Sequence, residues 1–336
     1  MKTRLVKKFT DSSEILFNKD LISKIHQENA TGNLEFGVSF LDEALLGIQK
    51  NDLILLGAPS GAGKTELATH IAYTNALQKK KVVYFALEAE KYEIELRATY
   101  KQKALSYYRA GGKEYTSFDT WMQGKCGHID SDEQVVSPIA KNYLTTRYVN
   151  GTYSIDNFLL DYTEIVNSSD LVILDHIHYF DLETTNENKE YKEIIKKIRT
   201  EVLEYGKPII VISHIKKRDR RFPTLAPDQE DFHGTSDLVK IATKVISISP
   251  QYDFQIFQHM PGGAEVHVQA DNFTFMRVAK NRRNGSVCRY ISATKYDHRT
   301  NAYHQSYYLG TQKTKDKQTI FLTEESSPQW AKSSIT

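Results

Sequence analysis

Apolar runs and amphipathic stretches alternate along the middle of the chain. Several short runs are almost wholly apolar, which is typical of strands buried on both faces. These runs lie at 53–56, 82–87, 171–174, 208–213 and 245–249. Between them, residues 66–78 and 191–204 carry apolar side chains at helical spacing. Because strands alternate with helices, the pattern predicts an α/β domain built on a mostly parallel central sheet flanked by helices.

The two ends of the chain depart from this alternation. Residues 1–36 are polar apart from an amphipathic stretch at 14–26, which predicts either a helix folded back on its own domain or an arm that docks on a neighbouring subunit. Near the other end, 274–279 and 286–294 predict a C-terminal antiparallel hairpin. We expect three parts, namely an arm at 1–36, one large domain at 37–310 and a polar, partly disordered tail at 311–336.

Composition and charge narrow the class of protein. The chain has 336 residues, of which 40% are hydrophobic, enough for one large core. Its formal net charge of +2 does not by itself favour a nucleic acid partner. Cys126 and Cys288 are far apart, which argues against a zinc site or a disulfide framework. No apolar run is long enough to span a bilayer, so we expect a soluble, cytoplasmic protein with no membrane partner.

The first apolar run leads into a glycine-rich turn, LILLGAPSGAGKT. Glycines let the backbone curl so that its N–H groups converge on the oxygens of a triphosphate, and the dipole of the following helix adds to them. Lys64 would bring a positive charge to the β- and γ-phosphates, and the Thr65 hydroxyl would bind Mg²⁺. Ala58 stands where the pattern usually begins with glycine, and a small residue is compatible there. The expected nucleotide contacts are Ser60, Gly61, Ala62, Gly63, Lys64 and Thr65.

Polar residues follow three of the later strands. Glu88 ends the second strand, where a carboxylate in the crevice beside a nucleotide can orient an attacking water; the alternative is a solvated glutamate. Asp175 closes the run DLVILD and is placed to contact Mg²⁺, often through water. His214 closes the run PIIVIS. These side chains and the glycine-rich loop predict a nucleotide site at one edge of the sheet.

Other groups are interpreted as structural. His176 and His178 follow the third strand, but two histidines without a third ligand rarely form a metal site. The tyrosines within 97–165 are expected in the core rather than as a platform for stacked bases. Ser39 and Asp42 have the spacing of a capping box that opens a short helix.

Basic residues cluster just beyond His214. The cluster follows the strand at 208–213 and therefore begins at the same edge of the sheet as the predicted nucleotide site. This position favours contact with a phosphate backbone over an ordinary solvated face. Its members are Lys216, Lys217, Arg218, Arg220 and Arg221.

Together these motifs resemble the RecA-fold motor domain of hexameric DnaB-type replicative helicases, in the branch of the phage primase–helicases and Twinkle. The resemblance covers residues 36–308, and its segments keep their order. They read FGVSFLDEALLGIQKNDLILLGAPSGAGKT, FALE, DLVILDHIHYF, PIIVISHIKK, DFHGTSDLVKIATKVISI and RVAKNRRNG. The resemblance implies a RecA-like P-loop NTPase core.

The resemblance also implies roles for single residues in ATP hydrolysis. Glu88 matches the family's catalytic glutamate, and His214 matches the sensor of the γ-phosphate. Lys280 and Arg282 match the pair that reaches the nucleotide of the neighbouring subunit, where an arginine stabilises charge on the transferring phosphoryl group. If this sequence is aligned with the family on its Arg-Asn-Gly motif, Arg283 takes this role instead of Arg282. Arg283 is therefore kept as an alternative.

A DNA contact follows from the same resemblance. His233, Gly234 and Ser236 correspond to the loop that holds single-stranded DNA in the central channel of the ring. His233 stands where the family usually has arginine, which weakens the predicted phosphate contact. The arm at 1–36 resembles the helix that links adjacent subunits, and we expect no primase or primase-binding domain before residue 36.

Our hypothesis is an ATP- and Mg²⁺-dependent replicative DNA helicase, a homo-hexameric ring that translocates on single-stranded DNA, from a phage or another mobile element. A separate primase or loader is a further expected partner. The first alternative is a RecA- or KaiC-like ATPase that assembles on or regulates DNA complexes without unwinding. The second is a nucleotide-switched assembly protein with no DNA substrate.

Overall fold

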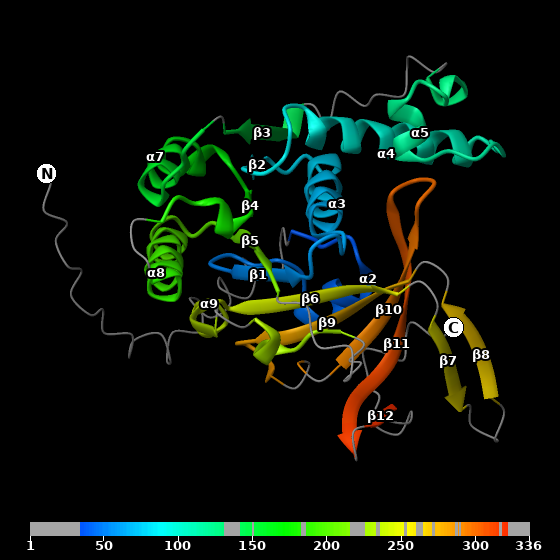
Figure 1. Cartoon of the computed structure of the whole chain (residues 1–336). Coiled ribbons are helices and arrows are strands. Elements are labelled where there is room, and N and C mark those ends of the chain that lie inside the picture. The colour runs from blue at the N-terminus through cyan, green and yellow to red at the C-terminus, as the bar shows by residue number, and fades with distance from the viewer. Residues whose placement is uncertain are drawn as a thin grey trace, which may run out of the picture. The chain divides into compact units, whose positions relative to one another are not determined.

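A large mixed sheet organises the fold (Figure 1). The computed structural model describes residues 34–130, 142–149, 151–182, 186–215, 226–232, 236–251, 254–259, 265–270, 273–285, 288, 290–315 and 318–321. The ten strands of this sheet lie in the order β12-β11-β10-β9-β6-β1-β5-β4-β2-β3. Strands β7 (Phe254–His259) and β8 (Glu265–Ala270) form a separate antiparallel pair.

The half of the sheet from β6 to β3 is parallel. Its strands are β1 (Leu53–Ala58), β2 (Val82–Ala86), β3 (Leu144–Tyr148), β4 (Leu171–Asp175), β5 (Ile209–His214) and β6 (Lys244–Gln251). Each of the five apolar runs forms one of these strands, and only the edge strand β3 was not expected. Side chains along β1 alternate between two cores: Ile54 and Leu56 face one, Leu53 and Leu55 the other.

Antiparallel strands complete the sheet beyond β6. They are β9 (Phe273–Asn281), β10 (Tyr290–Asp297), β11 (Ala302–Lys315) and β12 (Gln318–Phe321). Strands β9 and β10 pair as the predicted C-terminal hairpin, so the expected fold class is confirmed. Strand β11 continues past residue 310 and pairs with β12. The range 311–336, which we expected to be a tail, therefore contributes strand residues.

Helices lie on both faces of the sheet. The α-helices of the described residues are α2 (Ser39–Leu45), α3 (Lys64–Leu77), α4 (Glu93–Arg109), α5 (Phe118–Met122), α7 (Ile155–Ile165), α8 (Glu187–Tyr205) and α9 (Ser236–Ile241). Helices α2 and α3 share one core with the sheet, and α7, α8 and α9 share the other (Figure 1). Among the described residues, no helix is long and apolar enough to cross a membrane.

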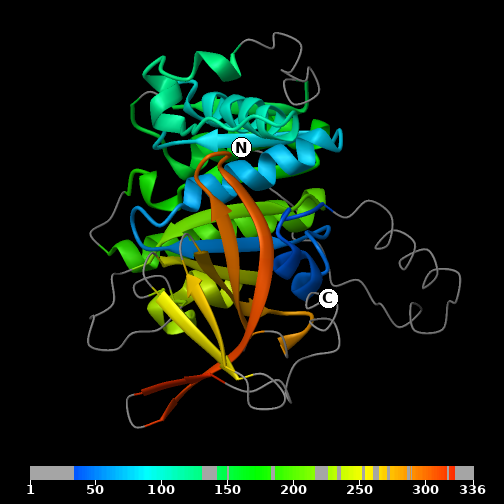
Figure 2. The same cartoon turned by 90° about the vertical axis from the view of Figure 1, so that its right-hand side faces the viewer.

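The turn between β10 and β11 reaches α4, as Figures 1 and 2 both show. The Tyr100 hydroxyl donates a hydrogen bond to the carbonyl oxygen of Arg299 (2.6 Å), and Lys101 Nζ donates to that of Asn301 (2.7 Å). Tyr100 is buried in a small third core together with Cys126 and Ile129, which confirms the core expectation for this tyrosine, whereas Tyr115 is 66% exposed and departs from it. These bonds fix the antiparallel hairpin against the helical side of the domain.

The capping box expected at Ser39 and Asp42 was wrong. Helix α2 has Val38 at its N-cap, without a side-chain cap. Asp42 Oδ1 instead accepts a hydrogen bond from the backbone N–H of Phe36 (2.6 Å). Burial raises the pKa of this carboxyl to about 6. The carboxylate therefore ties down the chain segment that enters the helix, rather than the helix's own first turn.

A buried ion pair anchors the start of β1 to β6. Lys244 Nζ lies 2.6 Å from Asp52 Oδ2, and these side chains are 1% and 3% exposed. The ammonium also donates to the carbonyl oxygen of Gly47 (2.8 Å). The carboxylate accepts from the Thr243 hydroxyl (3.0 Å) and from the backbone N–H of Gln49 (2.9 Å). Each charge therefore has several partners inside the protein.

We expect Lys244→Met to lower the free energy of unfolding by about 3–5 kcal/mol, because it strands the Asp52 carboxylate in the interior. Urea unfolding of the nucleotide-free protein at fixed concentration measures this loss. The matched control is Lys196→Met, which breaks an exposed pair with Glu193 and should cost far less, because exposed ion pairs contribute little to stability. Equal effects of the two substitutions would contradict the prediction.

Candidate active site

The glycine-rich loop joins the end of β1 to the start of α3. Gly61 and Gly63 have φ of +75° and +83°, in the left-handed region that favours glycine. Gly63 is the N-cap of α3, which has no side-chain cap. The first N–H groups of this helix are therefore available to an anion, and the helix dipole favours one there.

Lys64 is held over this loop. Its side chain is buried, and Nζ donates hydrogen bonds to the carbonyl oxygens of Ala58 (3.3 Å) and Pro59 (3.1 Å). Burial lowers the pKa of Lys64, against the opposing effect of the Asp175 and Glu88 carboxylates. A buried ammonium bonded to carbonyls of its own loop gains a stronger partner when a phosphate enters.

Asp175 lies at the end of β4 and faces the loop. Its Oδ2 accepts hydrogen bonds from the Thr65 hydroxyl (2.8 Å) and from the hydroxyl of buried Tyr84 (2.7 Å). Burial raises the pKa of this carboxyl. The paired oxygens of Thr65 and Asp175 are hard ligands of the kind that Mg²⁺ prefers, so the residues present fit this cation.

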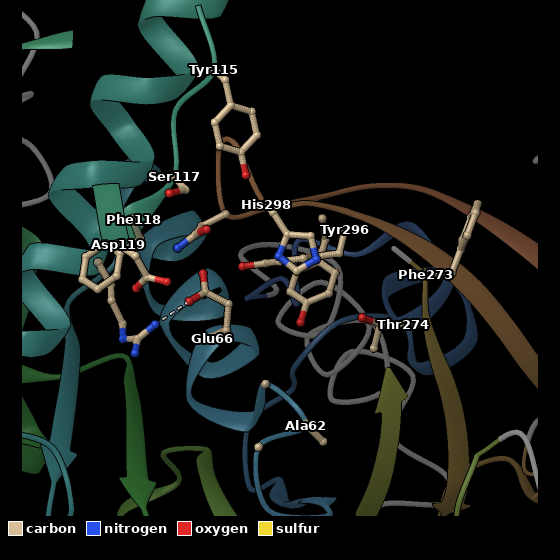
Figure 3. Close-up of a pocket in the computed structure, with 15 residues that line it drawn as sticks. Ala62, Glu66, Tyr115, Ser117, Phe118, Asp119, Phe273, Thr274, Tyr296 and His298 are labelled. Atoms are coloured by element: carbon tan, nitrogen blue, oxygen red, sulfur yellow. Dashed lines mark hydrogen bonds and ion pairs between the residues drawn. The ribbon is translucent and has the colours of Figure 1, made fainter. Parts of the chain in front are cut away.

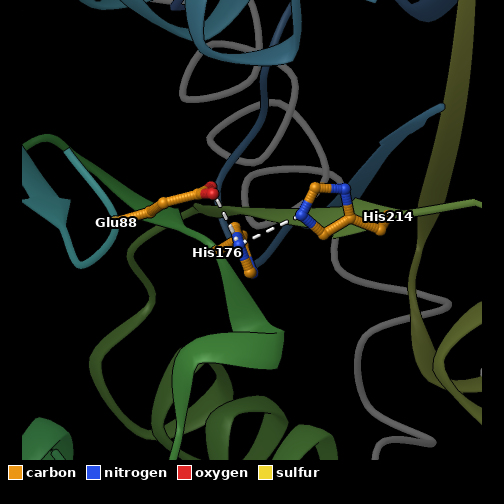
Figure 4. Close-up of side chains that lie close together, drawn as sticks. All are labelled: Glu88, His176 and His214. Atoms are coloured by element: carbon orange, nitrogen blue, oxygen red, sulfur yellow. Dashed lines mark hydrogen bonds and ion pairs between the residues drawn. The ribbon is translucent and has the colours of Figure 1, made fainter. Parts of the chain in front are cut away.

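Glu88, His176 and His214 meet at the ends of three neighbouring strands, β2, β4 and β5 (Figure 4). His176 Nε2 lies 2.9 Å from Glu88 Oε2 and 3.1 Å from His214 Nε2. Burial lowers the pKa of His176 to about 4 and that of His178 to about 3, and it lowers the pKa of His214 as well. The imidazoles of His176, His178 and His214 are therefore uncharged at neutral pH. Protonation of any of them in acid would add a positive charge near Lys64.

A cavity of about 460 Å³ adjoins the glycine-rich loop (Figure 3). Its walls come from the loop, from α3, α4 and α5, and from strands β9, β10 and β11. They include Ala62, Glu66, Arg97, Phe118, Tyr296 and Tyr303. Glu66 and Arg97 form an ion pair of 3.0 Å across one side. The volume and the aromatic walls suit a small organic ligand, and the cavity was not predicted because its walls come from distant parts of the sequence.

Comparison with known proteins identifies the family to which this fold belongs. Residues 33–289 match the family model described as the DnaB-like helicase C terminal domain. The chain belongs to that family. This DnaB-like domain therefore carries the RecA-type ATPase fold, and its family implies nucleoside triphosphate hydrolysis.

Solved structures agree with the fold of this DnaB-like domain. One of them, described as an ATPase domain, is 15% identical, with a TM-score of 0.62, and the match covers 88% of this chain and 99% of that one. A DnaB-like replicative helicase studied with primase is 16% identical, with a TM-score of 0.60, and 85% and 66% of the two chains are covered. No curated protein sequence matches the chain.

The interpretation of His176 as purely structural rested on a wrong premise. It assumed that no third ligand stood near the histidine pair, yet Glu88 and His214 both lie within hydrogen-bonding distance of His176. The sequence did contain a signal for this contact, namely the position of His176 at the end of a strand. Asp175-His176 ends a strand of the same parallel set as the strands that end in Glu88 and His214, and parallel strands deliver their carboxyl ends to one edge.

The residues expected to act across a subunit boundary lie at the end of β9. Lys280 Nζ donates hydrogen bonds to the carbonyl oxygens of Val239 and Lys240 in the last turn of α9 (2.7 Å each). Arg282 and Arg283 have exposed side chains. In the DnaB-like domain alone, the lysine is therefore occupied within its own chain and the two arginines face outward.

Several residues of the predicted DNA contacts lie outside the described part of the structure. They are the basic cluster Lys216, Lys217, Arg218, Arg220 and Arg221, together with His233 and Gly234. Ser236 is the first residue of α9.

Proposed function

We propose that this DnaB-like domain is an ATP- and Mg²⁺-dependent DNA helicase motor that acts as a homo-hexameric ring on single-stranded DNA during replication, in the cytoplasm of a cell that hosts a phage or another mobile element. The observation that carries the proposal is the meeting of Glu88 and His214 at the edge of the sheet that also holds the phosphate loop. A general base and a γ-phosphate sensor must both stand there if binding and hydrolysis are to be coupled.

The proposed roles within one subunit follow from the contacts. Residues 60–65 would cradle the phosphates, and Lys64 would leave its loop carbonyls for the β- and γ-phosphates. Thr65 and Asp175 would hold Mg²⁺, which supplies neutralisation of phosphate charge when bound. Glu88 would orient and deprotonate the attacking water. The cavity beside the loop would receive the nucleoside.

The neighbouring subunit would complete the site. Lys280 and Arg282 are proposed to approach the γ-phosphate in trans, with Arg283 as the alternative finger. The exposure of the two arginines at the end of β9 supports a contact with another chain. Lys280 would then exchange the α9 carbonyls for the neighbour's nucleotide, which couples ring assembly to the position of α9.

The proposed DNA contacts follow β5 and precede α9 in the sequence. The basic cluster at 216–221 and the loop with His233, Gly234 and Ser236 would follow the phosphate backbone of a single strand. One structurally similar DnaB-like helicase was solved in a study of its interactions with primase. We propose a separate primase or loader as a partner of this chain on that ground.

The first experiment measures ATP turnover with and without single-stranded DNA, and strand displacement on a forked duplex with ATP. We expect DNA to raise kcat and the fork to be opened, because a translocase couples each hydrolysis to a step on the strand. DNA binding with turnover but without displacement would favour the RecA- or KaiC-like alternative, for which His233 in place of arginine is the supporting observation. Turnover that DNA leaves unchanged would favour the assembly protein.

A further inference from the structure

His176 is the shared contact of the two side chains that the proposed mechanism uses. Its side chain is 8% exposed, whereas the Glu88 side chain is 62% exposed. In Figure 4 both Glu88 and His214 point at the imidazole of His176. An exposed glutamate moves among rotamers unless a fixed group holds it, so the buried imidazole is the group able to set its orientation.

The hydrogen bonds of His176 define where its proton lies. Its Nδ1 accepts a hydrogen bond from the backbone N–H of His178 (3.2 Å), so Nδ1 carries no proton. The single proton of the neutral ring is therefore on Nε2. This one donor faces two acceptors, Glu88 Oε2 and His214 Nε2. Two acceptors that share one donor compete for it.

The same geometry argues against a metal ion among these side chains. A metal-binding histidine almost always donates its second ring N–H to an oxygen, which leaves the other nitrogen free for the metal. In His176 the second nitrogen is an acceptor of a backbone N–H. Coordination through Nε2 would require a proton on Nδ1, where it would meet that N–H. The cluster is therefore a hydrogen-bonded bridge.

We propose that His176 is a positioning residue that couples the sensing of the γ-phosphate by His214 to the orientation of Glu88. This inference rests on the roles proposed above for those two residues. Without a γ-phosphate, His176 divides its Nε2–H between both partners. A γ-phosphate draws His214 toward its own oxygens, and the Nε2–H then bonds to Glu88 alone. The carboxylate is thereby fixed for the attacking water only when a triphosphate is present.

The test compares His176→Leu, which removes the donor, with His176→Gln, whose terminal amide places an N–H near the position of Nε2. We expect His176→Leu to lower kcat for ATP on the order of 10–100-fold, as expected for a misplaced catalytic group, with KM changed by less than about threefold. His176→Gln should regain most of the loss. The matched control is His128→Gln. His128 lies between α5 and β3 and is not part of the Glu88–His176–His214 cluster, so this variant should retain wild-type kcat.

A double-mutant cycle separates coupling from a general structural effect. In a His214→Ala background, His176→Leu should cost less than about a third of its effect on kcat in the wild type, because the two residues act as one unit. Additive effects, or equal losses in the Leu and Gln variants, would overturn the inference. So would about one equivalent of zinc in the purified protein that His176→Leu removes. Failure of the wild type to hydrolyse ATP would instead overturn the proposed function.

Discussion

Glu88→Gln should abolish ATP turnover, with kcat lowered by about 10²–10⁴-fold, while ATP still binds. Glutamine has nearly the same shape, and its amide oxygen can still accept the hydrogen bond from His176 Nε2, which now lies 2.9 Å from the carboxylate. It cannot accept a proton from water. Steady-state turnover gives kcat, and equilibrium titration with a fluorescent ATP analogue gives the affinity, which should stay within about threefold of the wild type because the phosphate loop is untouched.

Glu90→Gln is the matched control for this substitution. Glu90 is an exposed carboxylate two residues further along the same segment, and its replacement should leave kcat unchanged. If Glu88→Gln kept turnover within a few fold of the wild type, Glu88 would be a solvated strand-end glutamate, and the general base would lie elsewhere. If the variant failed to bind ATP, the carboxylate would be part of the binding site rather than the base.

The strands of the parallel half could be predicted because each is a continuous apolar run. Both faces of β1 and β4 lie against helices, so their sequences need no alternation. The edge strand β3, LTTRY, was missed because its side chains are only partly buried and it lacks such a run. The pairing of β11 with β12 was missed because a polar composition argued for a tail.

In the candidate site, the sequence could place only the residues that directly follow one apolar strand. Glu88, Asp175 and His214 each follow an apolar run, so their common sheet edge followed from the parallel topology. The contact of His176 with two of these residues depends on β4 lying between β2 and β5. Strand order is decided by packing over the whole sheet, and no local pattern around His176 carries it.

Lys280 shows a similar limit. Its spacing from Arg282 predicted a contact with the neighbouring subunit, whereas the structure places its ammonium on carbonyls at the end of α9, some 40 residues earlier in the sequence. Cations are stabilised at helix C-termini, so this contact is favourable for the single chain. The role in trans stays a prediction, and it requires an exchange of partners on assembly.

Arg282→Ala should lower kcat for ATP by about 10³-fold or more while leaving the nucleotide bound. The backbone N–H of Arg282 donates a hydrogen bond to the carbonyl oxygen of Thr243 (2.8 Å), which fixes the backbone and leaves the exposed guanidinium to reach outward. Removing the side chain should therefore spare the fold and the phosphate loop of the same subunit. Turnover and nucleotide affinity are measured as for Glu88→Gln, with Arg283→Ala as the neighbouring control.

Mixing the two inactive variants decides whether the arginine acts between subunits. A chain with Arg282→Ala keeps its own Glu88, and a chain with Glu88→Gln keeps its own Arg282. In a mixed ring, some interfaces pair an intact Glu88 with an intact neighbouring Arg282, so turnover should reappear although neither variant is active alone. No recovery in rings shown to be mixed would place the arginine within its own chain. Recovery with Arg283→Ala as the inactive partner, and full activity of Arg282→Ala, would identify Arg283 as the finger.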